Sequence, residues 1–330
     1  MLSRKWNYGI IILFILFSCL LLQFLFSTLH IRELANPKSR PLDGNPPPRV
    51  VLIAQEIDNP FWRTIEQGAR EASGKYRMNF EYTGPFRINP AEQIRLLEKA
   101  IASKADALLV QGINDPQQRM LIDKAALQGI PVITVDADEP GSQRLSYIGT
   151  DNLKAGKTMG ELIVKASGAK GSIGVLIANE KAYSQQLRLT GFRSVINRYP
   201  ELSVVDVRSS DISRLQAAQQ AEEILVQYPQ VGYMVGFSSL DGIGILEAAG
   251  RVRPQGLNIF AFDDLAETKK AVRQCRIVST IVQQPYEMGY GAISLLHDYF
   301  QGKKPTPQYF TEADILTSSK AGSGTGGGCP

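Results

Sequence analysis

The stretch RVVLIAQEIDNPFWRTIEQGAREAS, residues 49–73, contains one complete β–α unit. Its first six residues form a β-branched apolar run with the length of a buried strand. Four apolar residues between Phe61 and Ala72 then recur at helical spacing, and Asn59-Pro60 supplies an N-cap residue followed by proline at the first helical position. The stretch therefore predicts a buried strand followed by an amphipathic helix over Phe61–Ser73.

The same alternation continues as far as Leu316. Further strands are predicted over Met78–Tyr82, Ala107–Val110, Val132–Val135, Ser172–Ile177, Val204–Val207, Val231–Val235, Ile259–Phe262 and Val278–Val282. Further helices are predicted over Pro90–Ser103, Pro116–Gln128, Leu153–Ala166, Gln185–Arg198, Arg214–Gln227, Leu240–Ala249, Ala266–Gln274 and Tyr286–Phe300. Many of these strands are apolar throughout, which is typical of a parallel sheet covered on both faces. The pattern predicts a doubly wound α/β fold, and a length of roughly 270 residues favours two such lobes.

The composition excludes several function classes. The chain has 330 residues, 44% of them hydrophobic, and its formal net charge is 36 − 32 = +4. This charge is too small, and its basic residues too dispersed, for a nucleic-acid-binding surface. The chain has only two His and three Cys. These are too few to favour a zinc cluster, a disulfide framework or most histidine-based catalysis.

Gly9–Leu29 is a run of 21 residues without a charge. As a helix it would span about 31 Å, close to the ~30 Å hydrocarbon core of a bilayer. We expect an uncleaved membrane anchor at residues 1–30. A cleaved signal peptide, or a lipidated form that uses the weak lipoprotein box Leu16–Cys19, is the alternative. Pro37–Pro48 contains five prolines and predicts a semi-rigid extended spacer within residues 31–48.

Polar and aromatic side chains follow the predicted strands, at the edge where open α/β sheets bind their ligands. They are Gln55, Asp58, Asn59, Phe61, Trp62, Asp136, Thr150, Asp151, Asn152, Arg188, Ser238, Ser239, Asp263, Asp264, Gln283 and Gln284. Carboxylates accept hydrogen bonds from vicinal hydroxyls, amides and arginine donate them, and aromatic rings cover the apolar face of a sugar. The set therefore suits a neutral polyhydroxyl ligand.

Each of these residues also has a structural interpretation. Asp136 could be the N-cap of a helix. One of the adjacent aromatic residues Phe61 and Trp62 could belong to the core, because neighbouring positions on a helix cannot both face one side. Arg188 could be a solvated charge on a helix face, and Gln283 could satisfy backbone groups alone. The joint occurrence at successive strand ends favours the functional interpretation.

At these residues the chain resembles the type 1 periplasmic sugar-binding proteins, the ribose-binding-protein-like family, whose core also forms the effector domain of lactose-repressor-type regulators. The similarity runs from about Val50 to Leu296. The motifs that carry it are DNPFW (58–62), GIPVITVDAD (129–138), SYIGTDNLKAG (146–156), RLTGF (188–192), FAFDD (260–264) and STIVQQPYEMG (279–289). Their order over roughly 250 residues is specific, although no single motif would be.

The resemblance implies two Rossmann-like lobes joined by three hinge strands, with a sugar bound between them. We expect lobe 1 to comprise residues 49–150 and 284–312, lobe 2 to comprise residues 151–283 and 313–320, and residues 321–330 to form a flexible tail. The candidate ligand-binding residues are Asn59, Phe61, Trp62, Asp136, Thr150, Arg188, Ser238, Phe262, Asp263 and Gln283. Two positions depart from many ribose-binding relatives. Ala137 stands where they carry arginine, and Ser238-Ser239 stands where they carry an Asn-Asp pair, which argues for a monosaccharide other than ribose.

The resemblance also implies a function. We expect an extracytoplasmic receptor that delivers a pentose or hexose to an ABC-type importer, or alternatively a sugar-sensing receptor that signals through a membrane histidine kinase. It would be single-pass in a bacterial cell membrane, with Arg4 and Lys5 inside. A DNA-binding regulator is disfavoured because an apolar run and a spacer occupy the place of its helix-turn-helix. An enzyme is disfavoured because no nucleophile–base pair is evident, and we expect no cofactor, metal or nucleic acid.

Overall fold

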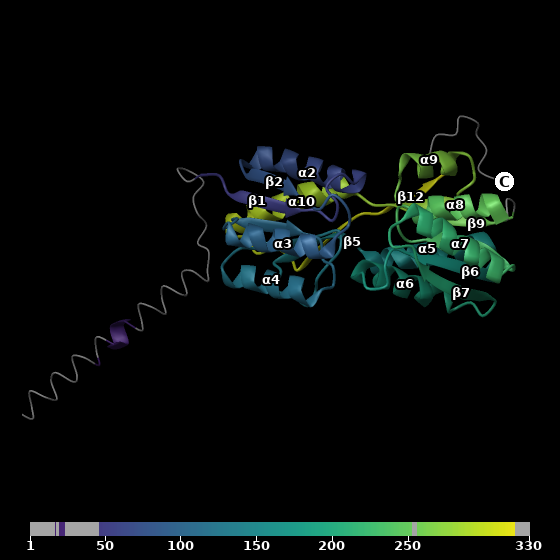
Figure 1. Cartoon of the computed structure of the whole chain (residues 1–330), viewed down its shortest axis with the longest axis horizontal. Coiled ribbons are helices and arrows are strands. Elements are labelled where there is room, and N and C mark those ends of the chain that lie inside the picture. Colours follow the sequence, from purple (N-terminus) through teal and green to yellow (C-terminus); the bar gives the residue numbers. More distant parts are fainter. Residues whose placement is uncertain (1–16, 18–19, 24–45, 253–255, 321–330) are drawn as a thin grey trace, which may run out of the picture.

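The computed structural model describes residues 17, 20–23, 46–252 and 256–320. Residues 46–320 form two α/β lobes that lie side by side, each built on a six-stranded sheet (Figure 1). The predicted anchor lies almost entirely outside the described residues, as do most of the spacer and the tail at 321–330. Within the described part of the chain, no helix combines the length and the apolar character that a bilayer span requires.

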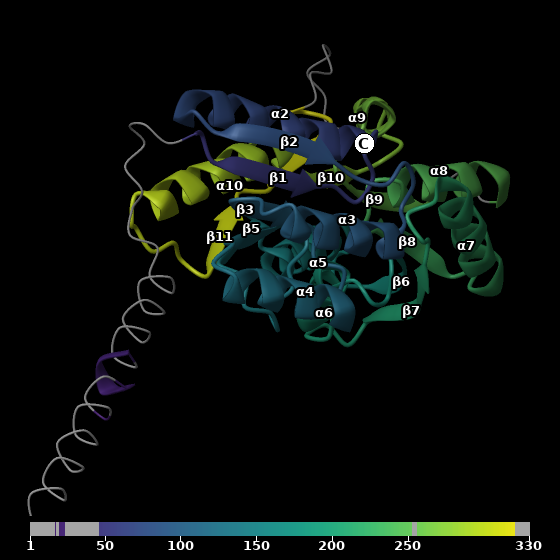
Figure 2. The ribbon, with the colours of Figure 1, turned by 60° about the vertical axis from the view of Figure 1, so that its left-hand side comes forward.

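The first lobe holds a sheet with the strand order β11-β5-β4-β3-β1-β2. Its strands are β1 (Arg49–Ile53), β2 (Asn79–Thr83), β3 (Ala107–Val110), β4 (Val132–Val135), β5 (Ser146–Thr150) and β11 (Gln308–Thr311). Its helices are α2 (Pro60–Tyr76), α3 (Pro90–Ala102), α4 (Pro116–Leu127) and α10 (Pro285–Phe300). All pairings in this sheet are parallel, and β11 lies beside β5 at one edge (Figure 2).

The second lobe repeats this plan, with the strand order β12-β10-β9-β8-β6-β7. Its strands are β6 (Gly171–Ile177), β7 (Leu202–Ser209), β8 (Val231–Gly236), β9 (Asn258–Phe262), β10 (Ser279–Val282) and β12 (Asp314–Thr317). Its helices are α5 (Asn152–Ser167), α6 (Tyr183–Ile196), α7 (Arg214–Gln227), α8 (Asp241–Val252) and α9 (Ala266–Arg273). The predicted two-lobe α/β architecture is therefore confirmed.

The described chain passes between the two sheets three times. It leaves the first lobe after β5, returns after β10, and crosses again in the two residues between β11 and β12. The last crossing explains the one antiparallel pairing among the described strands, between β10 and β12. The other strands of the second sheet end at the interface between the lobes, whereas β12 starts there and must run in the opposite direction.

Alternation along each strand builds a core on both faces of each sheet. In β1, Val50 and Leu52 pack with α2 and α10, whereas Val51 and Ile53 pack with α3 and α4. The second sheet is covered in the same way, by α5 and α6 on one face and by α7, α8 and α9 on the other. Cores on both faces account for the uniformly apolar strands from which the sheets are predicted.

The elements predicted from sequence are confirmed with ends that agree within three residues. The Asn59 side chain accepts a hydrogen bond from the Phe61 backbone N–H at 3.0 Å, so the predicted helix start is also confirmed. The prediction omits three strands, β5, β11 and β12. Strands β11 and β12 are short edge strands with mostly exposed or half-buried side chains, so they lack the apolar run that marks a central strand.

Candidate functional site

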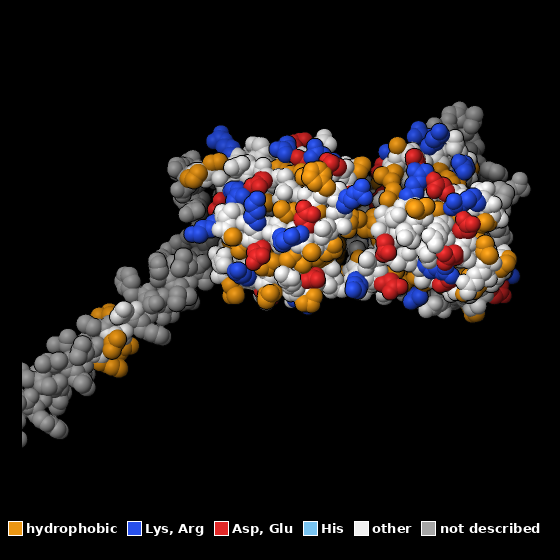
Figure 3. Space-filling model, viewed as in Figure 1, with side chains coloured by type: hydrophobic (Ala, Val, Ile, Leu, Met, Phe, Trp, Pro, Cys, Tyr) orange, Lys and Arg blue, Asp and Glu red, His pale blue; other side chains and the backbone are white. Residues whose placement is uncertain are grey.

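The carboxyl ends of strands from both sheets meet at a cleft between the lobes, with a volume of about 710 Å³ (Figure 3). The first lobe contributes residues that follow β1, β2, β3 and β4, and the second lobe residues that follow β6, β7, β8, β9 and β10. Eight of the ten candidate ligand-binding residues line this cleft. They are Asn59, Phe61, Trp62, Asp136, Arg188, Ser238, Asp263 and Gln283.

Arg188 is held on α6 by partners on several sides. Its Nε donates to Asn152 Oδ1 at 2.7 Å, its Nη1 to the Phe237 carbonyl at 2.6 Å, and its Nη2 to Gln283 Oε1 at 3.0 Å. The side chain is only 4% exposed, so the interpretation as a solvated surface charge is wrong. Burial lowers the pKa of Arg188, and the nearby Asp263 and Asp136 oppose that shift.

Asp136 and Asp263 occupy equivalent places in the two lobes, directly after β4 and β9. Both have a left-handed backbone, with φ of 68° and 64°. Each carboxylate accepts a hydrogen bond from a glutamine that follows the neighbouring strand. Gln111 Nε2 donates to Asp136 Oδ2 at 2.8 Å, and Gln283 Nε2 donates to Asp263 Oδ1 at 2.9 Å. No helix begins directly after Asp136, so the interpretation of Asp136 as an N-cap is wrong.

The two carboxylates are half-buried in the cleft, and this changes their acidity. Burial raises the pKa of Asp263 to about 6, although Arg188 and the hydrogen bond from Gln283 act to lower it. Burial also raises the pKa of Asp136, against the lowering effects of Arg188 and Gln111. The cleft therefore holds two carboxyl groups around one guanidinium, an arrangement that offers hydrogen-bond acceptors and donors close together.

Gln283 connects the site to the first crossing between the lobes. Its Oε1 accepts a hydrogen bond from Thr150 Oγ1 at 2.8 Å as well as one from Arg188. Its Nε2 donates to Asp263. All three partners are side chains, so the interpretation that Gln283 only satisfies backbone groups is wrong.

Thr150 and Phe262 are candidates that the structure places behind the cleft surface. Their exposed fractions are 1% and 0%. Thr150 supports Gln283, and the Phe262 ring lies under the Arg188 guanidinium. Both residues end strands, but their side chains point into the fold, so they support the wall of the cleft instead of lining it.

The aromatic pair on α2 is divided between the cleft and the core. Trp62 is 2% exposed and packs in the core of the first lobe, with an edge at the cleft, while Phe61 is half-buried. Their rings meet at 79° with centroids 6.4 Å apart. Asn59 caps α2 and donates from Nδ2 to Glu56 Oε2 at 3.1 Å. Phe61 is therefore the more accessible of the two rings.

Gln111 and a contact between the lobes at the cleft are not among the residues expected from the sequence. Gln111 follows the predicted strand Ala107–Val110 and could have been found by the strand-end rule that identified the others. At the mouth, Asn114 Nδ2 of the first lobe donates to the Lys181 carbonyl of the second lobe at 2.9 Å. Nothing in the local sequence pairs these two residues, because they come from loops 67 positions apart.

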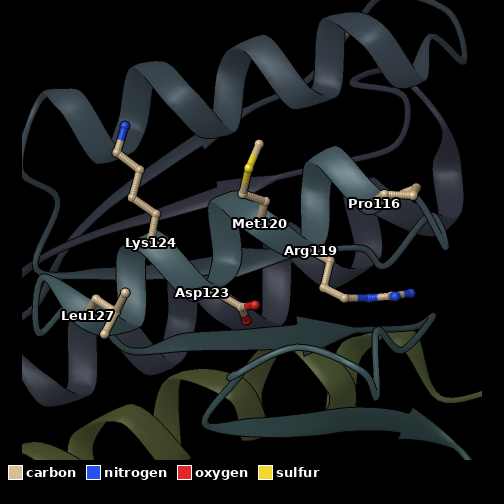
Figure 4. A pocket seen from close by; sticks show the side chains of 6 residues that line it. All are labelled: Pro116, Arg119, Met120, Asp123, Lys124 and Leu127. Carbon is tan, nitrogen blue, oxygen red and sulfur yellow. The ribbon is translucent and has the colours of Figure 1, made fainter.

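A second hollow, of about 390 Å³, lies on the outer surface of α4 (Figure 4). Its six lining residues all come from that helix: Pro116, Arg119, Met120, Asp123, Lys124 and Leu127. It is formed by the surface of one helix, and of its lining residues only Pro116 also lines the cleft, where the polar groups converge. The cleft between the lobes is therefore the stronger candidate for a ligand site.

A family model described as "Periplasmic binding protein domain" matches residues 50–304. The ribose import binding protein RbsB of Escherichia coli (strain K12) is 22% identical over 267 residues, which cover 81% of this chain and 90% of that protein. The structure of GanP, a glucose-galactose binding protein from Geobacillus stearothermophilus, is 34% identical, with a TM-score of 0.81 over 83% of this chain and 99% of that one. A chain of the XylFII-LytSN complex is 30% identical, with a TM-score of 0.77 and the same coverage.

Proposed function

Because the chain belongs to the type 1 periplasmic sugar-binding protein family, we propose that it binds a monosaccharide in the cleft between its two lobes. The observation that carries this proposal is the convergence of Asp136, Arg188 and Asp263, from both lobes, on one cleft. Carboxylates and a guanidinium bind adjacent hydroxyl groups through charge-assisted hydrogen bonds, and the half-buried Phe61 offers a ring face for the apolar side of a sugar.

The ligand is a pentose or a hexose. Relatives with the same fold include a ribose import binding protein and a glucose-galactose binding protein, so the family accommodates both pentoses and hexoses. In this chain Ala137 follows Asp136 and lines the cleft. Its short side chain leaves room beside the carboxylate, and Ser238 and Ser239 offer hydroxyls at the end of β8 in place of longer polar groups. Both features suit a ligand other than ribose.

Binding is coupled to closure of the lobes. A sugar that contacts Asp136 in the first lobe and both Arg188 and Asp263 in the second has more contacts when the cleft is closed. This differential affinity selects the closed state, and the three crossings between the sheets act as the hinge.

The closed receptor delivers its sugar to an ABC-type importer. RbsB is a ribose import binding protein, and this chain covers 90% of its length. The second candidate is a receptor that reports the sugar to a membrane histidine kinase. The similarity to XylFII in its complex with LytSN favours this alternative, because it places a protein of this fold in an assembly with a partner. In both roles the binding lobes are extracytoplasmic.

The apolar run Gly9–Leu29 anchors the chain in a bacterial cell membrane as a single-pass segment. The anchor raises the effective concentration of the receptor near its membrane partner. Membrane fractionation of the full chain tests this point. The anchored protein resists extraction by high salt and by alkali, whereas release of a shortened soluble form would mean that the run is a cleaved signal.

Two experiments separate the parts of this proposal. In a thermal-shift screen, a neutral monosaccharide should raise the melting temperature, whereas amino acids and purines should not. For the partner, the gene is deleted in a strain that expresses the importer genes constitutively. Loss of sugar uptake supports delivery to an importer. Normal uptake with loss of sugar-induced transcription supports the sensing role.

A further inference from the structure

We propose that the hydroxyl of Tyr147 is a positioning group that fixes Asp136 in the cleft and connects it to the hinge and to Arg188. The inference rests on the proposed function, since part of its effect is read through sugar binding. Tyr147 does not line the cleft; it lies on β5, is 3% exposed, and acts from behind the site.

The Tyr147 hydroxyl lies within hydrogen-bonding distance of two backbone carbonyls, those of Asp136 and Thr150. Tyr147 Oη lies 2.9 Å from the Asp136 carbonyl oxygen and 3.1 Å from the Thr150 carbonyl oxygen. Asp136 has φ of 68°, a conformation that is unfavourable for a residue with a side chain and needs support from its surroundings. The hydroxyl supports the carbonyl of this residue, while Thr150 is the last residue before the first crossing.

Gly149 makes room for this contact. A Cβ at position 149 would lie 2.3 Å from Tyr147 Oη and 3.0 Å from the Asp136 carbonyl oxygen. Any side chain there would push the phenol away from Asp136. The space between the Tyr147 hydroxyl and the Asp136 carbonyl is therefore open only because residue 149 is glycine.

Asn152 extends the connection into the second lobe. Its Nδ2 lies 3.4 Å from Tyr147 Oη and donates to the Thr150 carbonyl at 3.1 Å, while its Oδ1 accepts from Arg188 Nε at 2.7 Å. The chain of contacts thus runs from Asp136 through Tyr147 and Asn152 to Arg188. It joins the backbone of Asp136 in the first lobe, Thr150 at the first crossing and Arg188 in the second lobe.

The ring of Tyr147 has a separate packing role. It meets Phe310 of β11 at 71°, with ring centroids 6.1 Å apart. Burial holds the pKa of the Tyr147 phenol well above its ordinary value, so the hydroxyl keeps its proton and remains a donor. Phenylalanine at this position would keep the ring packing and remove only the hydroxyl, which makes Tyr147→Phe a selective test.

The test compares the full chain with Tyr147→Phe and with the control Tyr290→Phe. The control removes a hydroxyl of the same lobe that accepts from Lys75 Nζ at 2.7 Å, outside the cleft. Hydrogen exchange is measured without ligand. We expect faster amide exchange in Tyr147→Phe over residues 136–138 and 150–153, and unchanged exchange there in the control. Unchanged exchange in Tyr147→Phe would overturn the inference, whether or not a sugar binds.

Sugar affinity supplies the second readout. We expect Tyr147→Phe to weaken binding about tenfold in the native background and less than twofold in an Asp136→Asn background, because the hydroxyl acts through Asp136. Equal losses in both backgrounds would mean a general structural role and would overturn the inference. If the native chain binds no sugar, the proposed function fails, and the exchange comparison alone decides the role of Tyr147.

Discussion

The guanidinium of Arg188 lies over the ring of Phe262, with its Cζ 3.8 Å from the ring centroid. A cation over an aromatic face is stabilised by the ring quadrupole, more so when water is excluded. Arginine has five N–H donors, and three of them bind Asn152, the Phe237 carbonyl and Gln283 within the described residues. The Phe262 ring and these three hydrogen bonds hold the Arg188 guanidinium in place, and its two other N–H donors stay available for a ligand.

The first prediction concerns this cation. Arg188→Lys should weaken sugar binding at least 100-fold and lower the melting temperature, because a point charge cannot replace the planar fork and leaves buried acceptors unpaired. The control is Arg193→Lys, an exposed position on the same helix, which should change neither property. Calorimetry and thermal unfolding provide the measurements. An unaltered affinity in Arg188→Lys would remove Arg188 from the site.

The second prediction concerns the two carboxylates. Asp136→Ala and Asp263→Ala should each reduce the binding free energy by about 2–4 kcal/mol, because charge-assisted hydrogen bonds to the sugar are lost. Far-ultraviolet circular dichroism should remain native-like. The matched control is Asp264→Ala, which removes the adjacent carboxylate that pairs with Lys269 at 2.9 Å. Native affinity in both cleft variants would show that the ligand binds elsewhere.

The third prediction concerns pH. Because the pKa of Asp263 is raised to about 6, sugar affinity should fall as the pH drops below that value and the carboxylate is protonated. Stability of the free protein should change in the opposite direction. The folded-state pKa of Asp263 lies above the ordinary value of 3.8. The contribution of Asp263 to the free energy of unfolding is therefore fully present below about pH 3.8 and is lost as the pH rises through about 6.

Titrations between pH 5 and 8 check this prediction, with Asp263→Asn as the comparison. The variant should bind weakly and should lack the inflection near pH 6. Persistence of the inflection in Asp263→Asn would assign it to another group.

The fourth prediction concerns the packing of α5 on α6. A Cβ at Gly156 would lie 2.0 Å from the Arg188 carbonyl oxygen, so Gly156→Ala should force the helices apart, reduce stability by about 1–3 kcal/mol and weaken binding by displacing Arg188. Gly74→Ala is the control. It lies in α2, where the added Cβ would meet no atom within 4 Å beyond the adjacent backbone of its own helix, and should stabilise the protein by about 0.5–1 kcal/mol. Equal stability of the two variants, by denaturant unfolding, would contradict the packing argument.

Much of the fold could be predicted from sequence because buried parallel strands leave a strong signal. Runs such as Ala107–Val110 are apolar on both faces, and their helices carry caps such as Asn59-Pro60. The edge strands β11 and β12 lack this signal, since their side chains are mostly exposed or half-buried. Their place is set by pairing with β5 and β10, which are distant in the sequence.

The site shows the same division. Asp136 and Asp263 could be predicted because each directly follows a strand, and the resemblance to a two-lobed family implied that they share one cleft. The contacts that support these site residues from behind the cleft could not be predicted from the sequence. The packing of Phe262 under Arg188, the pairing of Gln111 with Asp136 and the reach of Tyr147 past Gly149 depend on side-chain directions in three dimensions. The local sequence around Arg188 also fits a surface helix, so its burial needed the structure.

The central claim is that one cleft binds an uncharged sugar between acidic groups from two lobes. Calorimetric titration of the purified protein against neutral pentoses and hexoses, amino acids and purines tests it most directly, with Asp136→Ala and Asp263→Ala titrated in parallel. We predict micromolar or tighter binding of at least one monosaccharide, strongly weakened in both variants. Binding of an amino acid or purine with no response to any sugar would contradict the claim.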